Sequence, residues 1–223
     1  VSNLQVKAIS ARSFQLALVS DNGRNLQTGS VRSGIDLSQA NLLGLGDELS
    51  LTYRNSGGSN DVLLSYQLPL NAKDLTLTTN YRYLPSWIIQ PPGFAELGIN
   101  SLYQQVFVGL RWPLRRTVEK EFALGVSLNH QDNRGLFLEG LPFPTRGSND
   151  NGETRVTTLS FNQDWIQRST KDVLAIRSEV GIGLAGWDTT TPADFGVNPD
   201  SPDASFLLWR GELQYVQIGR AHV

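Results

Sequence analysis

The sequence contains no cysteine and no methionine among its 223 residues. The lack of cysteine excludes disulfide bonds and metal sites with thiolate ligands. Because the chain starts at Val1 rather than at methionine, the absence of a signal peptide carries no information about the compartment, and we expect a piece of a longer protein.

Strong net charge and long apolar runs are also missing. Lys and Arg together number 19 against 21 acidic residues, so the electrostatic balance does not favour binding to nucleic acid. Nor does any stretch approach the roughly 18 consecutive apolar residues that a transmembrane helix requires. The weaker membrane signature remains, namely segments of about ten residues in which every second residue is apolar.

That alternation is what the sequence does contain. Leu49, Leu51 and Tyr53 alternate with Ser50 and Thr52, and a strand would place the two sets on opposite faces, whereas a helix would mix them. Similar runs recur along the chain and leave no helix of useful length. They predict ten strands, near residues 14–20, 31–37, 48–54, 61–68, 74–83, 105–112, 121–129, 155–165, 174–184 and 206–216.

The connections between these strands alternate in length. Compact ones cover residues 40–46, 69–73, 113–119 and 167–172, and later ones on the opposite side are long, covering 84–101, 133–153 and 188–205. Tight periplasmic turns at one end and extended external loops at the other are typical of outer-membrane barrels. We therefore predict an all-β fold, an antiparallel transmembrane β-barrel. A soluble β-sandwich remains an alternative.

A glycine-rich motif, "GLGD", precedes the strand at 48–54. A phosphate-binding loop would need a Lys-Ser/Thr pair and a following helix, and a dinucleotide fingerprint would also open a helix. Because a strand follows, we predict a periplasmic hairpin turn. Gly44 and Gly46 would adopt backbone angles closed to other residues, and Asp47 would accept a hydrogen bond from a free amide of the turn.

Catalytic chemistry finds no support in the sequence. His130 and His222 are isolated from each other, and no G-x-S-x-G elbow is present. Asp47 and Glu48 are neighbours on an extended chain, so their side chains point in opposite directions. We assign no catalytic, cofactor-binding or metal-binding residue and predict that the protein is not an enzyme.

Charged side chains of both signs fall on the face opposite the apolar ladders. On a lipid-facing surface each would cost a few kcal/mol at the bilayer midplane, so in a barrel they must face the lumen. In a soluble sheet the same face would contact water, and the apolar ladders would then need a second layer to cover them. The predicted lumen-facing residues are Arg32, Asp36, Glu48, Arg54, Arg82, Arg111, Glu121, Arg177 and Glu179.

The ordered set of motifs resembles a known family. "FQLALVSDNGRNLQTGSVRSGIDLSQANLLGLGDELSLTY" is similar to the opening barrel strands of the two-partner secretion transporters, the haemolysin secretion/activation family of ShlB/FhaC/HecB type. The likeness continues through "YQLPL", "GLRWPLRRT", "EFALGVSL", "FNQDWIQRS", "LAIRSEVGIGL" and "FLLWRGELQYVQ". It covers nearly the whole chain.

The resemblance implies a sixteen-stranded outer-membrane barrel of a diderm bacterium that follows two periplasmic POTRA domains. Such a barrel exports one unfolded partner protein, usually a large adhesin or haemolysin, without a cofactor. Residues 1–13 would then be the end of the POTRA region or a linker, and 14–217 the N-terminal part of the barrel. The POTRA domains and the family's Val-Arg-Gly-Tyr loop are expected outside this chain.

The last six residues, "IGRAHV" at 218–223, depart from the family pattern and are interpreted as a non-native tail, which removes His222 from consideration. Two alternatives to secretion stay open. One is the related outer-membrane protein assembly factor, which a larger number of POTRA domains would indicate. The other is a soluble ligand-binding β-sandwich or barrel.

Overall fold

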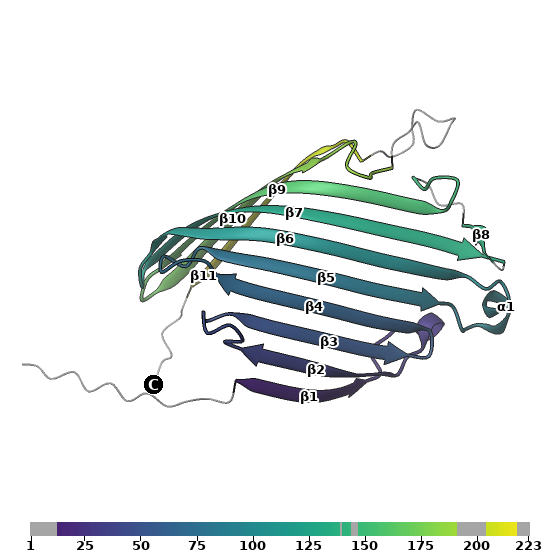
Figure 1. Cartoon of the computed structure of the whole chain (residues 1–223). Helices are drawn as coiled ribbons and strands as arrows, with labels where there is room; N and C mark the ends of the chain where they lie inside the picture. Colours follow the sequence, from purple (N-terminus) through teal and green to yellow (C-terminus); the bar gives the residue numbers. More distant parts are fainter. Residues whose placement is uncertain (1–12, 139, 144–146, 191–203, 218–223) are drawn as a thin grey trace, which may run out of the picture.

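The computed structural model describes residues 13–138, 140–143, 147–190 and 204–217 (Figure 1). The predicted assignments for residues 1–12 and for the tail at 218–223 lie outside the described residues. The elements are β1 (Phe14–Asp21), η1 (Leu26–Thr28), β2 (Arg32–Ala40), β3 (Glu48–Ser56), β4 (Ser59–Pro69), β5 (Thr76–Trp87), α1 (Pro92–Ala95), β6 (Asn100–Arg116), β7 (Lys120–Phe137), β8 (Leu141–Pro142), β9 (Glu153–Arg168), β10 (Asp172–Gly183) and β11 (Leu207–Gln217).

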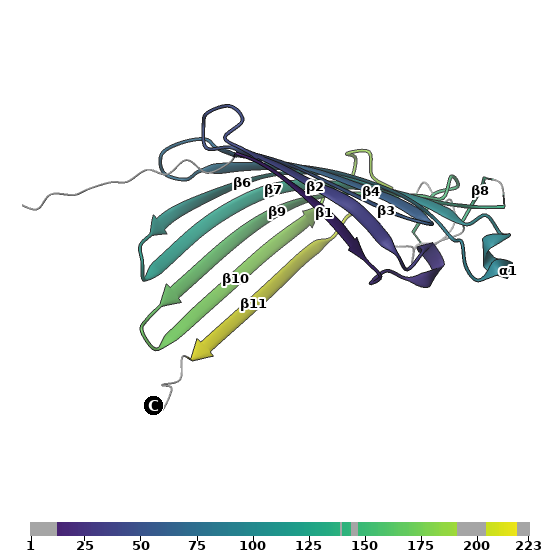
Figure 2. The ribbon, with the colours of Figure 1, turned by 90° about the horizontal axis from the view of Figure 1, so that it is seen from below.

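The strands form one antiparallel sheet in which each long strand pairs with the next. The order is β1-β2-β3-β4-β5-β6-β7-β9-β10-β11, and the two-residue β8 pairs with β7. The sheet is curved like part of a barrel wall and is not closed, with β1 and β11 at its edges (Figures 1 and 2). The prediction of an antiparallel all-β barrel fold with about ten strands is confirmed.

Pairing register, rather than a packed interior, organises the side chains. Cross-strand partners lie on the same face of a sheet, so apolar residues line up across several strands. One such row runs through Leu68, Leu77, Leu110, Val126, Phe161, Val180 and Trp209. Among the described residues only Ala123 and Ala204 are buried hydrophobics. The sheet is therefore a single layer whose apolar face must be covered by something other than the described chain.

The strands are longer than the alternation predicted. β6 has 17 residues and β7 has 18, whereas the apolar pattern marked only 105–112 and 121–129. Many of the additional residues toward the long connections are polar on both faces, with Asp132 and Arg134 on one face of β7 and Gln131 and Asn133 on the other. Hydrophobic periodicity cannot detect a strand whose two faces are both polar. The predicted loops at 84–101 and 133–153 are correspondingly shorter in the structure.

The two ends of the sheet are built differently. At one end the connections are compact, at residues 41–47, 70–75, 117–119 and 169–171. At the other end, β3 and β4 are joined by Gly57 and Gly58 alone, a two-residue hairpin loop. The Gly58 amide donates to Thr28 O at 2.8 Å, and the Trp87 amide donates to Gly58 O at 2.8 Å, so neighbouring connections pack on this turn.

No helix in the described ranges has the length and apolar character needed to cross a membrane.

Candidate functional site

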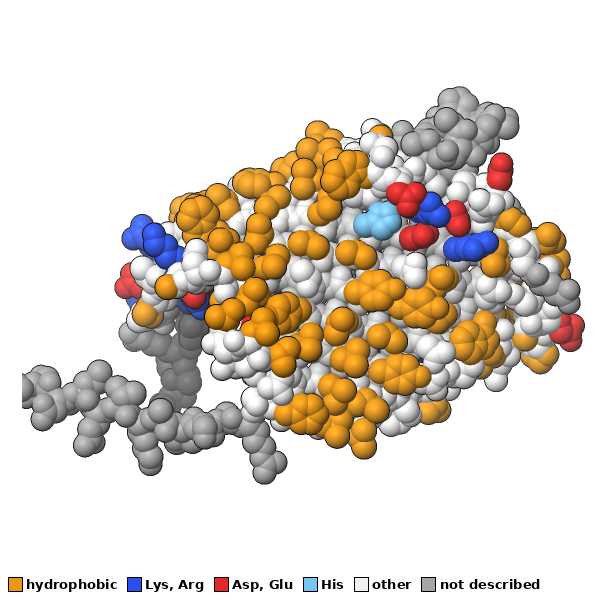
Figure 3. All heavy atoms as spheres, viewed as in Figure 1, with side chains coloured by type: hydrophobic (Ala, Val, Ile, Leu, Met, Phe, Trp, Pro, Cys, Tyr) orange, Lys and Arg blue, Asp and Glu red, His pale blue; other side chains and the backbone are white. Residues whose placement is uncertain are grey.

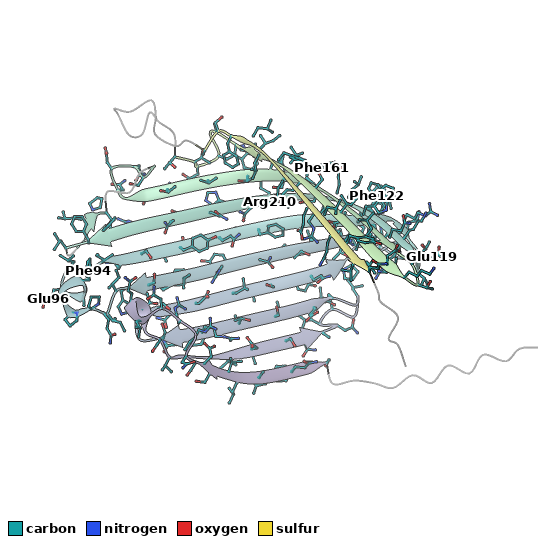
Figure 4. All side chains as sticks on the ribbon, turned by 180° about the vertical axis from the view of Figure 1, so that it is seen from behind. Phe94, Glu96, Glu119, Phe122, Phe161 and Arg210 are labelled. Atoms are coloured by element: carbon teal, nitrogen blue, oxygen red, sulfur yellow. The ribbon has the colours of Figure 1, made fainter. Side chains whose placement is uncertain are left out.

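The two faces of the sheet differ in chemistry. Figure 3 shows the convex face, which is covered largely by hydrophobic side chains. Leu18, Trp209 and Leu213 on this face are 78%, 70% and 69% exposed. Figure 4 views the concave face from behind, with β11 crossing in front of the other strands and Arg210 labelled on it. The concave face carries the polar side chains and is the candidate site.

All nine residues predicted to face the lumen lie on the concave face. The pairing register shows this directly, since Arg54 pairs with Gly34 and Asp61, Asp36 with Thr52, and Glu179 with Arg210. Uncharged polar residues occupy much of the remaining concave surface. One row across the sheet is polar except for Phe107 and reads Ser38, Ser50, Ser65, Asn80, Phe107, Asn129 and Thr158.

Most of the predicted charges are joined in ion pairs that bridge neighbouring strands. Arg54 Nη2 lies 2.7 Å from Asp36 Oδ2, and both residues had been predicted. Thr52 Oγ1 donates to the other oxygen of Asp36 at 3.0 Å. Arg111 Nη2 lies 2.7 Å from Glu121 Oε1, which joins two more of the predicted residues.

Other predicted residues pair with carboxylates that the sequence analysis missed. Arg32 lies 2.8 Å from Asp21. Arg82 binds Asp61 with both ends of its guanidinium fork, Nε to Oδ1 at 2.9 Å and Nη2 to Oδ2 at 2.7 Å. Asp61 is the first residue of the predicted strand at 61–68, where apolar and polar residues do not alternate regularly, so alternation does not show which face it lies on.

Asp164 is a third carboxylate that the sequence analysis missed, and it connects three strands. Its Oδ1 accepts from Arg177 Nε at 3.0 Å, and its Oδ2 lies 3.6 Å from Arg111 Nε. Glu179 faces Arg210 on β11, with Glu179 Oε2 and Arg210 Nη1 3.5 Å apart. No ion pair involves Glu48 within the described part of the chain, although it lies on the same face at the compact-turn end.

The glycine-rich turn at 41–47 is held by Asp47, which is 1% exposed. Its carboxylate accepts from the Leu43 amide at 3.0 Å, the Leu45 amide at 3.4 Å and the Tyr66 hydroxyl at 3.0 Å. Gly44 and Gly46 adopt φ angles of +80° and +77°, which are strained for side chains with a Cβ.

The hydrogen bonds to Asp47 also set its acidity. Burial alone raises the pKa of the Asp47 carboxyl, because desolvation disfavours the charged form. The amides of Leu43 and Leu45 and the Tyr66 hydroxyl all stabilise the carboxylate, and together they lower the pKa below its ordinary value. Asp47 is therefore an anionic cap that satisfies two backbone donors of the turn.

A separate charged cluster lies on the convex face, toward the long connections. Arg155 on β9 contacts three carboxylates, those of Asp132 at 3.4 Å, Glu153 at 3.0 Å and Asp188 at 2.7 Å. His130, the pale blue group in Figure 3, lies at its edge, with Nδ1 2.8 Å from Thr157 Oγ1. This cluster interrupts the apolar surface of β7 and β9.

The described residues contain no group of three or more His, Asp and Glu side chains arranged to hold a metal ion. The arrangement on the concave face is instead an extended polar wall, in which neighbouring strands are joined by charge-assisted hydrogen bonds. Such a wall can remain hydrated and can contact a chain lying along it.

Comparison with known proteins adds a family and a fold. The family model described as "Haemolysin secretion/activation protein ShlB/FhaC/HecB" matches residues 1–221. No curated protein sequence matches the chain.

Two solved structures of CdiB share the fold. CdiB from Escherichia coli superposes with a TM-score of 0.78 and 19% identity, over 93% of this chain and 38% of that chain. CdiB from Acinetobacter baumannii superposes with a TM-score of 0.59 and 17% identity, over 91% of this chain and 34% of that chain. The chain thus spans between a third and two-fifths of the length of these proteins.

Proposed function

This chain belongs to the haemolysin secretion/activation family ShlB/FhaC/HecB, and from that membership we propose that it forms part of an outer-membrane barrel that exports a large partner protein. The partner is of the adhesin or haemolysin type and passes unfolded from the periplasm to the cell surface. The compact turns, including the one held by Asp47, face the periplasm, and the long connections face outward. Residues 1–13 connect the barrel to the periplasmic side.

The division of the sheet into two faces is the observation that carries the proposal. The convex face presents apolar ladders without a covering layer from the described chain, as a lipid-facing wall requires. The concave face presents serine, threonine, asparagine and paired charges. In a closed barrel the concave face lines the interior, so a partner chain would travel along a hydrated polar surface.

The chain's own residues do three things in this mechanism. The backbone ladder pairs each strand between β1 and β11 with a neighbour on both sides, so these strands satisfy their backbone hydrogen bonds within the wall, as a lipid environment demands. The apolar ladders anchor the wall in the bilayer. The polar face lets an unfolded chain exchange its hydrogen bonds with water for bonds with the wall at little cost.

The path of the partner can be tested by crosslinking, because the sequence has no cysteine to give background. Ser127 and Val126 are neighbours on β7 that point to opposite faces, Ser127 pairing with Gly109 and Val126 with Leu110. Each is changed to cysteine in a full-length transporter that carries this segment, and a partner with a thiol-reactive probe is stalled during export. We expect crosslinks at Ser127→Cys and none at Val126→Cys.

Equal crosslinking at both positions, or crosslinking only at Val126→Cys, would contradict a passage along the concave face. The kind of partner is tested separately by deleting the transporter in its host and comparing the proteins of the cell surface and medium. Loss of one large adhesin or haemolysin supports the proposal. Loss of many outer-membrane barrels instead would point to an assembly factor.

A further inference from the structure

Most charges of the concave face are engaged in ion pairs, and of its described carboxylates Glu48 on β3 and Glu212 on β11 have none. Six arginines of this face lie within 3.5 Å of a carboxylate, and each pair joins neighbouring strands. The arginines are Arg32, Arg54, Arg82, Arg111, Arg177 and Arg210. Their six carboxylate partners are Asp21, Asp36, Asp61, Glu121, Asp164 and Glu179. The charges of the paired groups therefore cancel.

Four of these carboxylates, those of Asp21, Asp36, Asp61 and Glu179, are engaged on both oxygens, which is a stronger condition than neutrality. Asp36 accepts from Arg54 on one oxygen and from Thr52 on the other, at 2.7 and 3.0 Å. Asp61 takes both arms of the Arg82 fork. A carboxylate that is satisfied in this way has little to offer to a lysine or arginine in transit.

The same holds near both ends of the row of strands. Glu179 Oε1 accepts from Ser160 Oγ at 3.0 Å, while its Oε2 faces Arg210. Asp21 Oδ2 accepts from Arg32 and its Oδ1 from the Gly23 amide at 3.1 Å. The double engagement is thus found on β1, β2, β4 and β10, in different sequence contexts.

We propose that the concave wall is electrostatically self-satisfied, and that it takes a polypeptide in transit through the chain's backbone and uncharged polar groups without selecting it by charge. This inference rests on the proposed export function and deepens it by naming how the wall recognises its substrate. The uncharged groups available for such contacts include Ser50, Ser65, Asn80 and Asn129.

The Arg82–Asp61 pair provides the test, because each member can be neutralised with little change of shape. Full-length transporters carrying this segment are made with Arg82→Gln, with Asp61→Asn and with both. Each is supplied with three versions of one exported partner, bearing a short inserted block of lysines, of glutamates or of serines. The measured quantity is the ratio of lysine-block to glutamate-block export, with the serine block as the control for insertion.

Asp61→Asn leaves Arg82 open and should favour the glutamate block, and Arg82→Gln should favour the lysine block. Because an exposed ion pair is worth little in water, each single change should shift the ratio by up to about fivefold. The double variant should return the ratio to that of the parent. Comparing variants cancels any contribution from wall segments outside this chain.

Two results would overturn the inference. One is that both single variants export the lysine-block and glutamate-block partners in the parental ratio, which would mean that Arg82 and Asp61 do not face the partner in transit. The other is a double variant whose ratio differs from that of the parent, which would mean that the intact pair itself selects by charge. Heat-modifiable migration on gels establishes that each barrel has folded.

If a single variant does not fold, the charge-swapped pair Arg82→Asp with Asp61→Arg takes its place. A parental ratio in the swapped pair supports the inference, and an altered ratio overturns it. Failure of the export function itself looks different, because the parent would then export none of the three partners, the serine block included.

Discussion

The position of the apolar, lipid-facing band on the convex face predicts that two arginine substitutions on one strand differ strongly in their effect on the free energy of unfolding. Val108 and Gln104 both lie on the convex face of β6, since Val108 pairs with Thr79 and Leu128, and Gln104 pairs with Tyr83 and Asp132. We expect Val108→Arg to destabilise the barrel strongly and Gln104→Arg to have little effect. The two variants add the same side chain to the same face.

The expected magnitude follows from the register. On β6 and β7 eight residues separate an aromatic residue near the compact turns from the first polar residue of the convex face. These are Trp112 and Gln104 on β6, and Phe122 and His130 on β7. With about 3.4 Å of rise per residue and a tilt of about 40°, eight residues span about 21 Å along the membrane normal, near the ~25 Å of a typical band.

Val108 lies halfway along this interval, about 10 Å from either boundary by the same rise and tilt. An arginine at the midplane of a barrel's lipid face costs about 2–4 kcal/mol, and one near the interface about 0–1 kcal/mol. Ser127→Arg on the concave face adds the charge to water and serves as a third variant. It should behave like Gln104→Arg.

The assay is the free energy of unfolding in phospholipid vesicles, followed by urea titration and by heat-modifiable migration, in a full-length transporter that carries this segment. A Val108→Arg barrel as stable as Gln104→Arg would refute the assignment of the convex face to lipid. A Ser127→Arg barrel as unstable as Val108→Arg would refute the assignment of the concave face to water.

Three further experiments test other parts of the structure. Asp47→Asn should lower the free energy of unfolding at neutral pH. Because the folded pKa of Asp47 is lowered, the stability that its carboxylate contributes is present above about pH 4 and is lost as pH falls through the folded pKa. The acid unfolding curves of parent and variant should therefore converge, and curves that stay parallel would contradict this. Gly34→Ala should cost about 1–3 kcal/mol by overpacking, since a Cβ there would meet the Tyr53 carbonyl oxygen at 2.1 Å and Arg54 Cδ at 2.6 Å; an unchanged urea midpoint would contradict this. In cysteine variants at Leu51 and Ser50, a lipid-phase reagent should modify only Leu51→Cys, and preferential reaction at Ser50→Cys would reverse the facing of β3.

Alternation along the chain predicted the strands and their facing because the period of a strand is local. The side chain of Leu51 faces opposite to that of Ser50 whatever the neighbouring strand is, so one sequence window is sufficient. The same reasoning placed Arg54 and Asp36 on one face. It could not show that they touch, because that depends on how β2 and β3 are registered.

The features that sequence reasoning missed depend on the third dimension or on mixed faces. Asp61 and Asp164 lie in runs where apolar and polar residues are less regular, with Leu63 on the concave face and Gln163 on the convex one. The need for glycine at 34 arises from the Tyr53 carbonyl oxygen and the Arg54 side chain of the next strand, which both lie close to it. Neither fact has a signature within a single strand.

The convex cluster around Arg155 indicates where the wall leaves the membrane. Beyond the first polar residue of the convex face, β6 continues for four residues past Gln104 and β7 for seven past His130. At the same rise and tilt this corresponds to about 10–18 Å of sheet above the lipid. Charges on the convex face would be costly in hydrocarbon, but here they pair with one another, with Arg155 holding Asp132, Glu153 and Asp188. The cluster thus joins β7, β9 and the segment after β10 in the part of the sheet that lies beyond the lipid. The mouth of the proposed conduit then stands above the bilayer surface.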